Sequence, residues 1–264
     1  MNESKLLQIA IDASIKASER IMEIYLNENF EIQSKEDDSP LTKADLAANK
    51  IICELLENTE IPILSEEGKH LPYSERQHWE SLWIVDPIDG TKEFIKRNGE
   101  FTVNIALVTN QIPVLGVILV PATQEIYFAS SELGSFKSCV DNINTDLDIT
   151  IDKAQKLPFK NSTNPYIVAA SKSHQTKETV DYIEQLSKEH KYVQLISKGS
   201  SLKICMVAEG SANCYPRFAP TMEWDTAAGQ AICIYAGKEV IDMTTNKSIL
   251  YNREILTNNW FLVK

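Results

Sequence analysis

The sequence has no apolar run that approaches the ~18 residues of a membrane-spanning helix, so we expect no integral membrane segment. Its opening residues carry an early acidic side chain and helical apolar spacing, which is unlike a secretory leader. The five cysteines contain no C-x-x-C pair, a pattern that disfavours a zinc site or a disulfide framework. We therefore expect reduced core thiols in a cytoplasmic protein, with a peripheral contact to the inner membrane as an open alternative.

Basic residues are also scarce, with 26 Lys and Arg against 37 Asp and Glu, which gives a formal net charge of -11. Such a surface repels a polyanion over most of its area, so we expect no nucleic-acid partner. If the ligand is nevertheless a small anion, a local site must reverse the sign of the potential.

Several catalytic signatures are absent as well. The sequence contains no H-E-x-x-H, no cluster of cysteine and histidine, no G-x-S-x-G and no P-loop. Zinc hydrolase, serine hydrolase and P-loop chemistry therefore have no support. Oxygen chemistry based on carboxylates is what remains.

Hydropathy patterns predict a mixed α/β (α+β) protein. Apolar residues recur at helical spacing from Leu6 to Ile24 and from Ala44 to Leu56, so two helices are expected to pack on a sheet. Short β-rich runs follow, and their close spacing indicates an antiparallel N-terminal sheet. These runs cover residues 61–65, 82–86, 101–109, 114–120 and 125–128.

After a polar stretch at 141–164, strands and helices alternate, which predicts a smaller C-terminal α/β subdomain. The expected strands are 166–170 and 192–196, and the expected helices are 179–186, 200–208 and 225–236. We therefore predict a single domain over 1–264, with a metal-binding α+β subdomain over about 1–150 and a substrate-binding α/β subdomain over 165–264.

Two carboxylates stand at the end of an expected strand, in the sequence Trp-Ile-Val-Asp-Pro-Ile-Asp-Gly-Thr at 83–91. The proline fixes one backbone angle and the glycine permits a turn that other residues avoid, so Asp86 and Asp89 can converge on one point. The backbone carbonyl of Ile88 then faces the same point. Oxygen ligands of this kind suit Mg²⁺. The alternative is a tight turn with two solvated acids.

Three further acids occupy similar settings. Glu66 follows an expected strand, Asp225 opens an expected helix, and Asp45 lies in the first turn of another. Each has a structural alternative, namely an exposed turn for Glu66, a helix cap for Asp225 and a favourable helix-terminus charge for Asp45.

Two segments of the C-terminal half are candidates for binding an anion. Ser171 and His174 follow an expected strand, and 199–203 opens a helix whose free N–H groups suit a phosphate. On spacing alone, a capping serine, an exposed histidine and a solvated Lys203 remain alternatives. Arg217 fits a phosphate contact and a structural ion pair equally well.

Taken together, segments 64–67, 86–91 and 224–229 resemble, in order and spacing, the three signatures of the inositol monophosphatase superfamily. Further runs are similar to the bacterial CysQ-type branch, the 3'(2'),5'-bisphosphate nucleotidases. Those runs are 90–104, 199–203 and 215–218. The resemblance covers nearly the whole chain and is weakest from about 138 to 164.

The resemblance implies the layered α/β/α/β/α fold of sugar phosphatases and two or three Mg²⁺ ions. It implies Asp45 and Thr91 as a water-activating catalytic pair, with Glu66 nearby. The implied metal ligands are Glu66, Asp86, the Ile88 carbonyl, Asp89 and Asp225. The implied substrate-binding residues are Glu66, Ile88, Asp89, Gly90, Thr91, Ser171, His174, Gly199, Lys203 and Asp225.

The leading functional hypothesis from this resemblance is hydrolysis of adenosine 3',5'-bisphosphate, a by-product of sulfate assimilation, to AMP and phosphate. The resemblance also implies inhibition by lithium, and we expect a monomer or a homodimer. An inositol or sugar monophosphatase with the same metal site is the first alternative. A non-catalytic, metal-dependent regulatory protein is the second, and the retained catalytic residue types count against it.

Overall fold

The computed structural model describes residues 1–26, 33–34, 40–69, 71–160, 164–170 and 176–264. Its largest unit is a seven-stranded sheet in the order β3-β4-β5-β6-β7-β8-β9. The strands of this sheet are β3 (Ile63–Ser65), β4 (Ser81–Asp89), β5 (Thr102–Thr109), β6 (Ile112–Val120), β7 (Glu125–Ser130), β8 (Gly134–Cys139) and β9 (Gln155–Lys156).

The sheet is antiparallel, as expected, except at the edge where β3 runs parallel to β4. A parallel pair needs a crossover connection, and here the connection from Ser65 to Ser81 contains the short helix α3 (Tyr73–Arg76). Successive residues of a strand point to opposite faces. Ile105 and Ala106 are both fully buried but belong to two different apolar clusters, so the sheet is covered on both sides.

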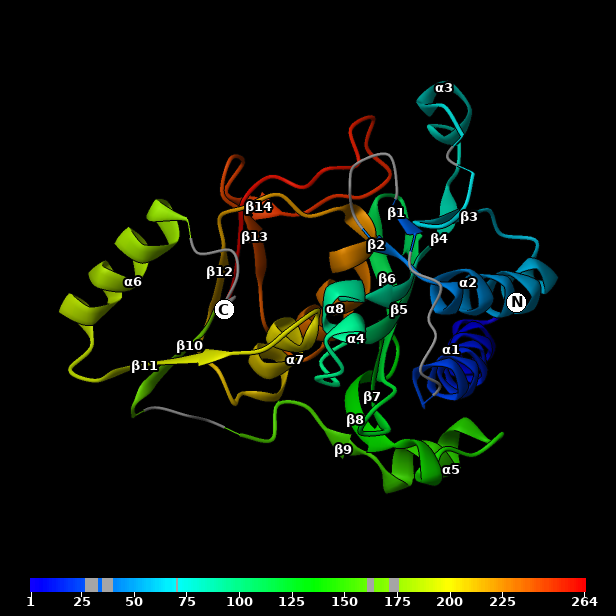
Figure 1. The fold of residues 1–264 in the computed structure, drawn as a ribbon, viewed down its shortest axis with the longest axis horizontal. Helices are drawn as coiled ribbons and strands as arrows, with labels where there is room; N and C mark the ends of the chain where they lie inside the picture. The colour runs from blue at the N-terminus through cyan, green and yellow to red at the C-terminus, as the bar shows by residue number, and fades with distance from the viewer. Residues whose placement is uncertain (27–32, 35–39, 70, 161–163, 171–175) are drawn as a thin grey trace.

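Two long helices, α1 (Glu3–Leu26) and α2 (Lys43–Leu56), cover one face of this sheet (Figure 1). Leu7 and Ile11 of α1 are fully buried in the same cluster as Val117 and Phe128 of the sheet. The apolar spacing that predicted both helices is therefore the spacing of their buried face.

The other face is covered by α7 (Leu202–Glu209) and α8 (Glu223–Tyr235) (Figure 1). The contact between α8 and β6 is very close, because a Cβ atom at Gly116 would lie 2.5 Å from the carbonyl oxygen of Ala228. Only glycine permits this approach. The packing of α8 on the sheet fixes where the first turn of α8 lies.

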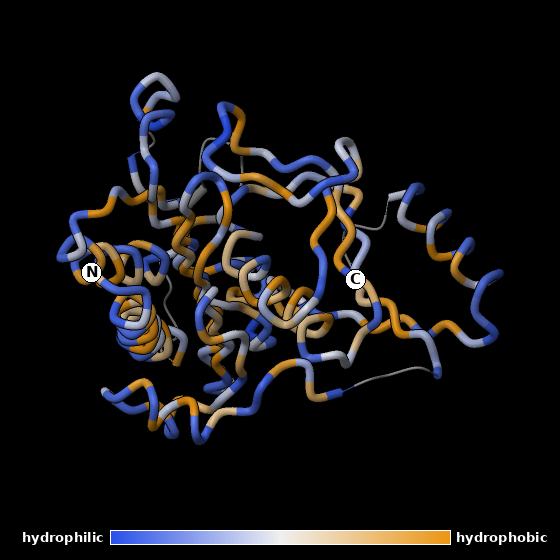
Figure 2. The backbone as a smooth tube through the Cα atoms, turned by 180° about the vertical axis from the view of Figure 1, so that it is seen from behind, coloured by the Kyte–Doolittle hydropathy of each residue, from blue (hydrophilic) through white to orange (hydrophobic). Residues whose placement is uncertain are grey.

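Beyond α8 lies a second, antiparallel sheet in the order β12-β15-β13-β14, accompanied by the parallel pair β10–β11 and, on the outside, by α6 (Figure 1). Figure 2 shows apolar and polar residues alternating along α6, which packs Leu186 against Val168 and Leu262. The bounds are β10 (Tyr166–Ala170), α6 (Lys177–Glu189), β11 (Val193–Ser197), β12 (Tyr215–Arg217), β13 (Val240–Asp242), β14 (Lys247–Ser248) and β15 (Phe261–Val263). The layers follow the α/β/α/β/α order that the resemblance implies.

The remaining described elements are short. They are β1 (Gln33–Ser34), β2 (Pro40–Leu41), the 3-10 turns at Glu57–Thr59 and Val140–Asn142, α4 (Thr91–Ile95) and α5 (Leu147–Lys153). In the described part of the chain, no helix combines the length and apolarity needed to cross a membrane.

Some sequence-based expectations differ from the structure. The helix expected from residue 200 begins at Leu202, because Ser200 adopts a left-handed backbone angle, φ 53°. The second sheet was not predicted, since strands of two or three residues carry too little alternation to be recognised. All five cysteines are free, but Cys53 and Cys139 are only half-buried and are not core residues.

Candidate active site

The end of β4 holds the first two carboxylates of the site. The strand continues past Asp86 to Asp89, with a shift in its register against β5 between these two residues. Asp86 is 1% exposed, and its Oδ1 accepts a hydrogen bond of 3.0 Å from the N–H of Ile88. Gly90 then turns the chain into α4 with φ 91°, which side chains rarely allow. The turn predicted from Pro-Ile-Asp-Gly is therefore present.

A third carboxylate comes from the first turn of α8. Asp225 Oδ2 accepts a hydrogen bond of 2.8 Å from the N–H of Met222, the N-cap residue. Asp225 thus contributes to the helix cap from the third position of α8, whereas the structural alternative placed it at the helix start. It also joins the acids of β4, because one ligand oxygen each of Asp86, Asp89 and Asp225 lies within 4.8 Å of the others. The Asp225 side chain thus both contributes to the cap of α8 and belongs to the carboxylate cluster.

The carboxylates perturb one another strongly. Burial raises the pKa of Asp86 well above its usual range, and the charges of Glu66, Asp89 and Asp225 raise it further. A side-chain hydrogen bond also links Glu66 to Asp86. Burial and the neighbouring Asp89 likewise raise the pKa of Asp225. Such a group of oxygen ligands with surplus negative charge fits a hard divalent cation, which would offset the repulsion.

Asp45 and Thr91 meet beside this cluster. Asp45 is 2% exposed, and its Oδ2 accepts from both the N–H and the hydroxyl of Thr42, at 2.7 and 2.5 Å, at the start of α2. Thr91 Oγ1 lies 3.3 Å from Asp45 Oδ1 and 3.3 Å from the carbonyl oxygen of Ile88. Asp45 therefore accepts hydrogen bonds from the N-cap residue Thr42 with Oδ2 and faces Thr91 with Oδ1.

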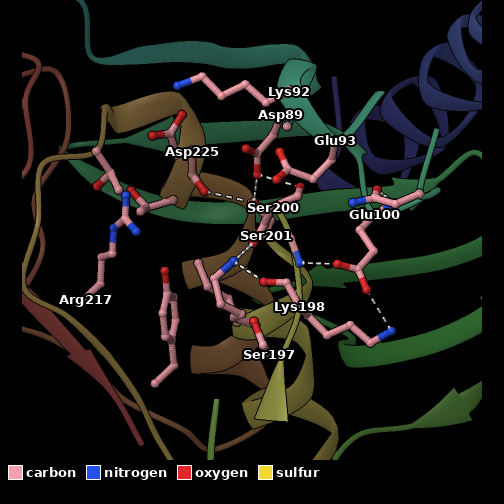
Figure 3. A pocket seen from close by; sticks show the side chains of 18 of the residues that line it. Asp89, Lys92, Glu93, Glu100, Ser197, Lys198, Ser200, Ser201, Arg217 and Asp225 are labelled. Carbon is pink, nitrogen blue, oxygen red and sulfur yellow. Dashed lines mark hydrogen bonds and ion pairs between the residues drawn. The ribbon is translucent and has the colours of Figure 1, made fainter. Parts of the chain in front are cut away.

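A cavity of about 440 Å³ opens beside the acids (Figure 3). Of the residues expected to bind substrate, it is lined by Asp89, Gly90, Gly199, Lys203 and Asp225, whereas Glu66, Ile88 and Thr91 are not among its lining residues. Its wall carries five cationic side chains, namely Lys92, Lys96, Lys198, Lys203 and Arg217, and, besides Asp89 and Asp225, the acids Glu93 and Glu100. Lys198 forms an ion pair of 3.2 Å with Glu100. The cavity therefore gathers positive charge that most of this acidic protein's surface lacks, and a cation held by Asp89 and Asp225 would add to it.

Lys203 is buried rather than solvated. Its Nζ donates to the carbonyl oxygens of Lys198 and Ser200, at 2.9 and 2.7 Å, and burial lowers its pKa to about 8. Arg217 donates from Nη2 to the Pro220 carbonyl oxygen at 3.2 Å. Among the residues that the structure describes, no acid forms an ion pair with Arg217, so the structural ion pair, one of the two alternatives for this residue, is not formed there.

Residues 198–201, which we call the serine loop, connect β11 to α7 and bring two hydroxyls to Asp89 that sequence reasoning missed (Figure 3). Thr102 and Asn104 lie behind these serines and were missed too. A signal was present, because both are polar residues at alternate positions of an otherwise apolar strand. Ser171 and His174, predicted to bind substrate, lie outside the described residues.

Comparison with known proteins identifies the family of this chain. The profile of the inositol monophosphatase family matches residues 2–263. A 3'(2'),5'-bisphosphate nucleotidase CysQ of Salmonella typhimurium is 42% identical over 262 residues, which cover 98% of this chain and 99% of that protein. The corresponding CysQ of Escherichia coli K12 is 41% identical over 250 residues, 94% of each chain.

The crystal structure of CysQ from Bacteroides thetaiotaomicron, described as a bacterial member of the inositol monophosphatase family, superimposes with a TM-score of 0.91 at 50% sequence identity. The match covers 99% of this chain and 97% of that one. On its sequence and its fold, this chain belongs to the inositol monophosphatase family.

Proposed function

We propose that this protein is a Mg²⁺-dependent 3'(2'),5'-bisphosphate nucleotidase, which hydrolyses the 3'-phosphate of adenosine 3',5'-bisphosphate to leave AMP and phosphate. The relatives at 41–50% identity that carry this activity in their names, or the name CysQ, support the assignment. They match nearly the full length of the chain, so no separate domain is needed to explain the activity.

The observation that carries the proposal is the position of the carboxylate cluster beside a cavity that also holds five cationic side chains. Asp89 and Asp225 belong to both the cluster and the cavity lining. A phosphate at the acids therefore has its remaining substituents in the cavity. In the described part of the chain, Lys92 and Lys96 line this cavity without an ion-pair partner. Unpaired cations favour a substrate with a second anionic group over a neutral polyol.

We propose Glu66, Asp86, the Ile88 carbonyl, Asp89 and Asp225 as the residues that hold two or three Mg²⁺ ions. When bound, these ions supply positive charge to the phosphoryl group and make a water molecule more acidic. The protein itself supplies Thr91, whose hydroxyl is placed to donate to Asp45 and so to accept a hydrogen bond from the attacking water. Asp45 keeps the threonine oriented. As the attacking water loses its proton to Thr91 Oγ1, the hydroxyl proton of Thr91 passes to Asp45 Oδ1.

The test is phosphate release from adenosine 3',5'-bisphosphate and from inositol 1-phosphate, at equal concentrations and with Mg²⁺ in excess. The proposal predicts a kcat/KM for the bisphosphate at least tenfold higher. Preference for inositol 1-phosphate would instead support the inositol monophosphatase alternative, which rests on the family membership alone. Release of phosphate from neither substrate would favour a non-catalytic role.

A further inference from the structure

The carboxylate of Asp89 is held by the serine loop rather than by its own strand. The hydroxyls of Ser200 and Ser201 both donate to Asp89 Oδ2, each at 2.7 Å (Figure 3). Charge-assisted hydrogen bonds of this length are among the stronger ones in proteins. Two of them on one oxygen fix the carboxylate plane and leave Oδ1 as the oxygen without a serine donor.

A second row of polar side chains orients the two serines. Asn104 Nδ2 donates to Ser201 Oγ at 2.9 Å, and Thr102 Oγ1 lies 2.6 Å from Ser200 Oγ. Thr102 is fully buried and Asn104 is 1% exposed. Because the amide group of Asn104 is the donor to Ser201, the single proton of that serine is directed away from it, toward Asp89 or the more distant Asp225 carbonyl oxygen at 3.0 Å.

The backbone of the serine loop is itself held in place. A Cβ atom at Gly199 would lie 2.6 Å from the Glu100 carbonyl oxygen, and the N–H of Gly199 donates to Glu100 Oε2 at 2.9 Å. Ser200 has φ 53°, a conformation that costs a residue with a side chain about 1 kcal/mol or more. Lys203 donates to the Ser200 carbonyl oxygen. Contacts on three sides thus hold a strained serine against Asp89.

We propose that Ser200 and Ser201 are positioning residues of the metal site, which hold Asp89 so that its other oxygen is presented to the cation together with Asp86 and Asp225. The proposal rests on Asp89 being a metal ligand, as in the proposed function. Ser200 and Ser201 line the substrate cavity and also orient Asp89. The proposal therefore gives a loop of the substrate cavity a role in cation affinity. Partners that orient a ligand typically change metal affinity by about 10- to 100-fold.

The experiment measures Mg²⁺ binding to metal-stripped protein by isothermal titration calorimetry, without substrate, for Ser201→Ala and Ser200→Ala. Each variant is expected to raise the Kd for Mg²⁺ by about 10-fold or more. The matched control is Ser197→Ala, at the end of β11, since Ser197 has no side-chain hydrogen bond to the described residues. Its Kd for Mg²⁺ should stay within about twofold of the wild-type value.

A kinetic readout separates positioning from a general loss of structure. Raising the Mg²⁺ concentration should restore most of the kcat of the alanine variants, and the KM for nucleotide at saturating Mg²⁺ should change by less than about threefold. Ser200 is only half-buried, so its alanine variant still decides the question if Ser201→Ala does not fold. An unchanged Kd for Mg²⁺ in a folded Ser200→Ala protein would overturn the proposal.

The outcomes also distinguish this proposal from the proposed function. A wild-type protein that binds Mg²⁺ but does not hydrolyse adenosine 3',5'-bisphosphate would refute the nucleotidase assignment, while the titrations of the serine variants would still test the positioning role. A wild-type protein that binds no divalent cation would refute both.

Discussion

Lys203 is predicted to contact substrate and lines the cavity, and in the structure its ammonium group also braces the serine loop. The informative perturbation is Lys203→Met, which removes the charge and the two bonds to the carbonyl oxygens of Lys198 and Ser200 while keeping an apolar stem. Lys203 is 5% exposed. Burial, the largest effect, lowers its pKa from the ordinary 10.5 to about 8.

The pH dependence of folding stability follows from the pH at which the folded and the unfolded protein each lose the Lys203 proton. The folded protein releases the Lys203 proton near pH 8, and the unfolded chain releases it near 10.5. Between these values the unfolded chain binds more protons, so the stability of the folded state rises with pH. The full effect is about 3 kcal/mol, and about 2 kcal/mol of it falls between about pH 7 and 9.5.

The assay is urea unfolding of metal-free wild-type and Lys203→Met protein at several pH values in this range. The wild-type free energy of unfolding should gain about 2 kcal/mol relative to the variant as the pH rises. Buried tyrosines titrate in both proteins, so their effect largely cancels in the difference. A difference that stays constant within about 0.5 kcal/mol would refute the assignment of a buried, destabilised ammonium group to Lys203.

Three further predictions concern the reaction. Asp225→Asn should lower turnover by several orders of magnitude with little change in the circular dichroism spectrum, because it removes a proposed ligand charge and no core volume; near-normal turnover would contradict the metal assignment. At saturating Mg²⁺, which offsets a weakened cation site, Lys203→Ala should reduce kcat/KM for adenosine 3',5'-bisphosphate by about 10- to 100-fold and change the transition-state free energy for a simple sugar phosphate by less than about 0.5 kcal/mol. Equal losses on both substrates would make Lys203 a loop brace only. Li⁺ and Ca²⁺ should inhibit at fixed Mg²⁺, since one carries a single charge and the other coordinates loosely; full activity in excess Li⁺ would remove that expectation.

Sequence by itself determined the features that depend on neighbours along the chain. The apolar spacing predicted α1 and α2, and the Pro-Ile-Asp-Gly turn at the end of β4 predicted the convergence of Asp86 and Asp89. Asp225 was predicted as a helix cap or a site residue, and Asp45 as a helix-terminus charge or a site residue. In the structure each carboxylate accepts a hydrogen bond at the start of its helix and also faces Thr91 or the acids of β4. Such features are local, because their geometry is set within one or two turns of the chain.

Only the tertiary structure decided which distant side chains meet. Asp225 reaches the acids of β4 because α8 packs closely on the sheet at Gly116, a contact that no local pattern specifies. The serine loop illustrates the same limit, since sequence placed Ser200 in a helix, whereas contacts with Glu100 and Lys203 hold it in a left-handed conformation against Asp89. The burial of Lys203 likewise came only from the tertiary structure, which excludes the solvated alternative and leaves the predicted substrate contact open to test. Packing between segments far apart in the sequence fixes the positions of these side chains, and local propensity carries no information about such packing.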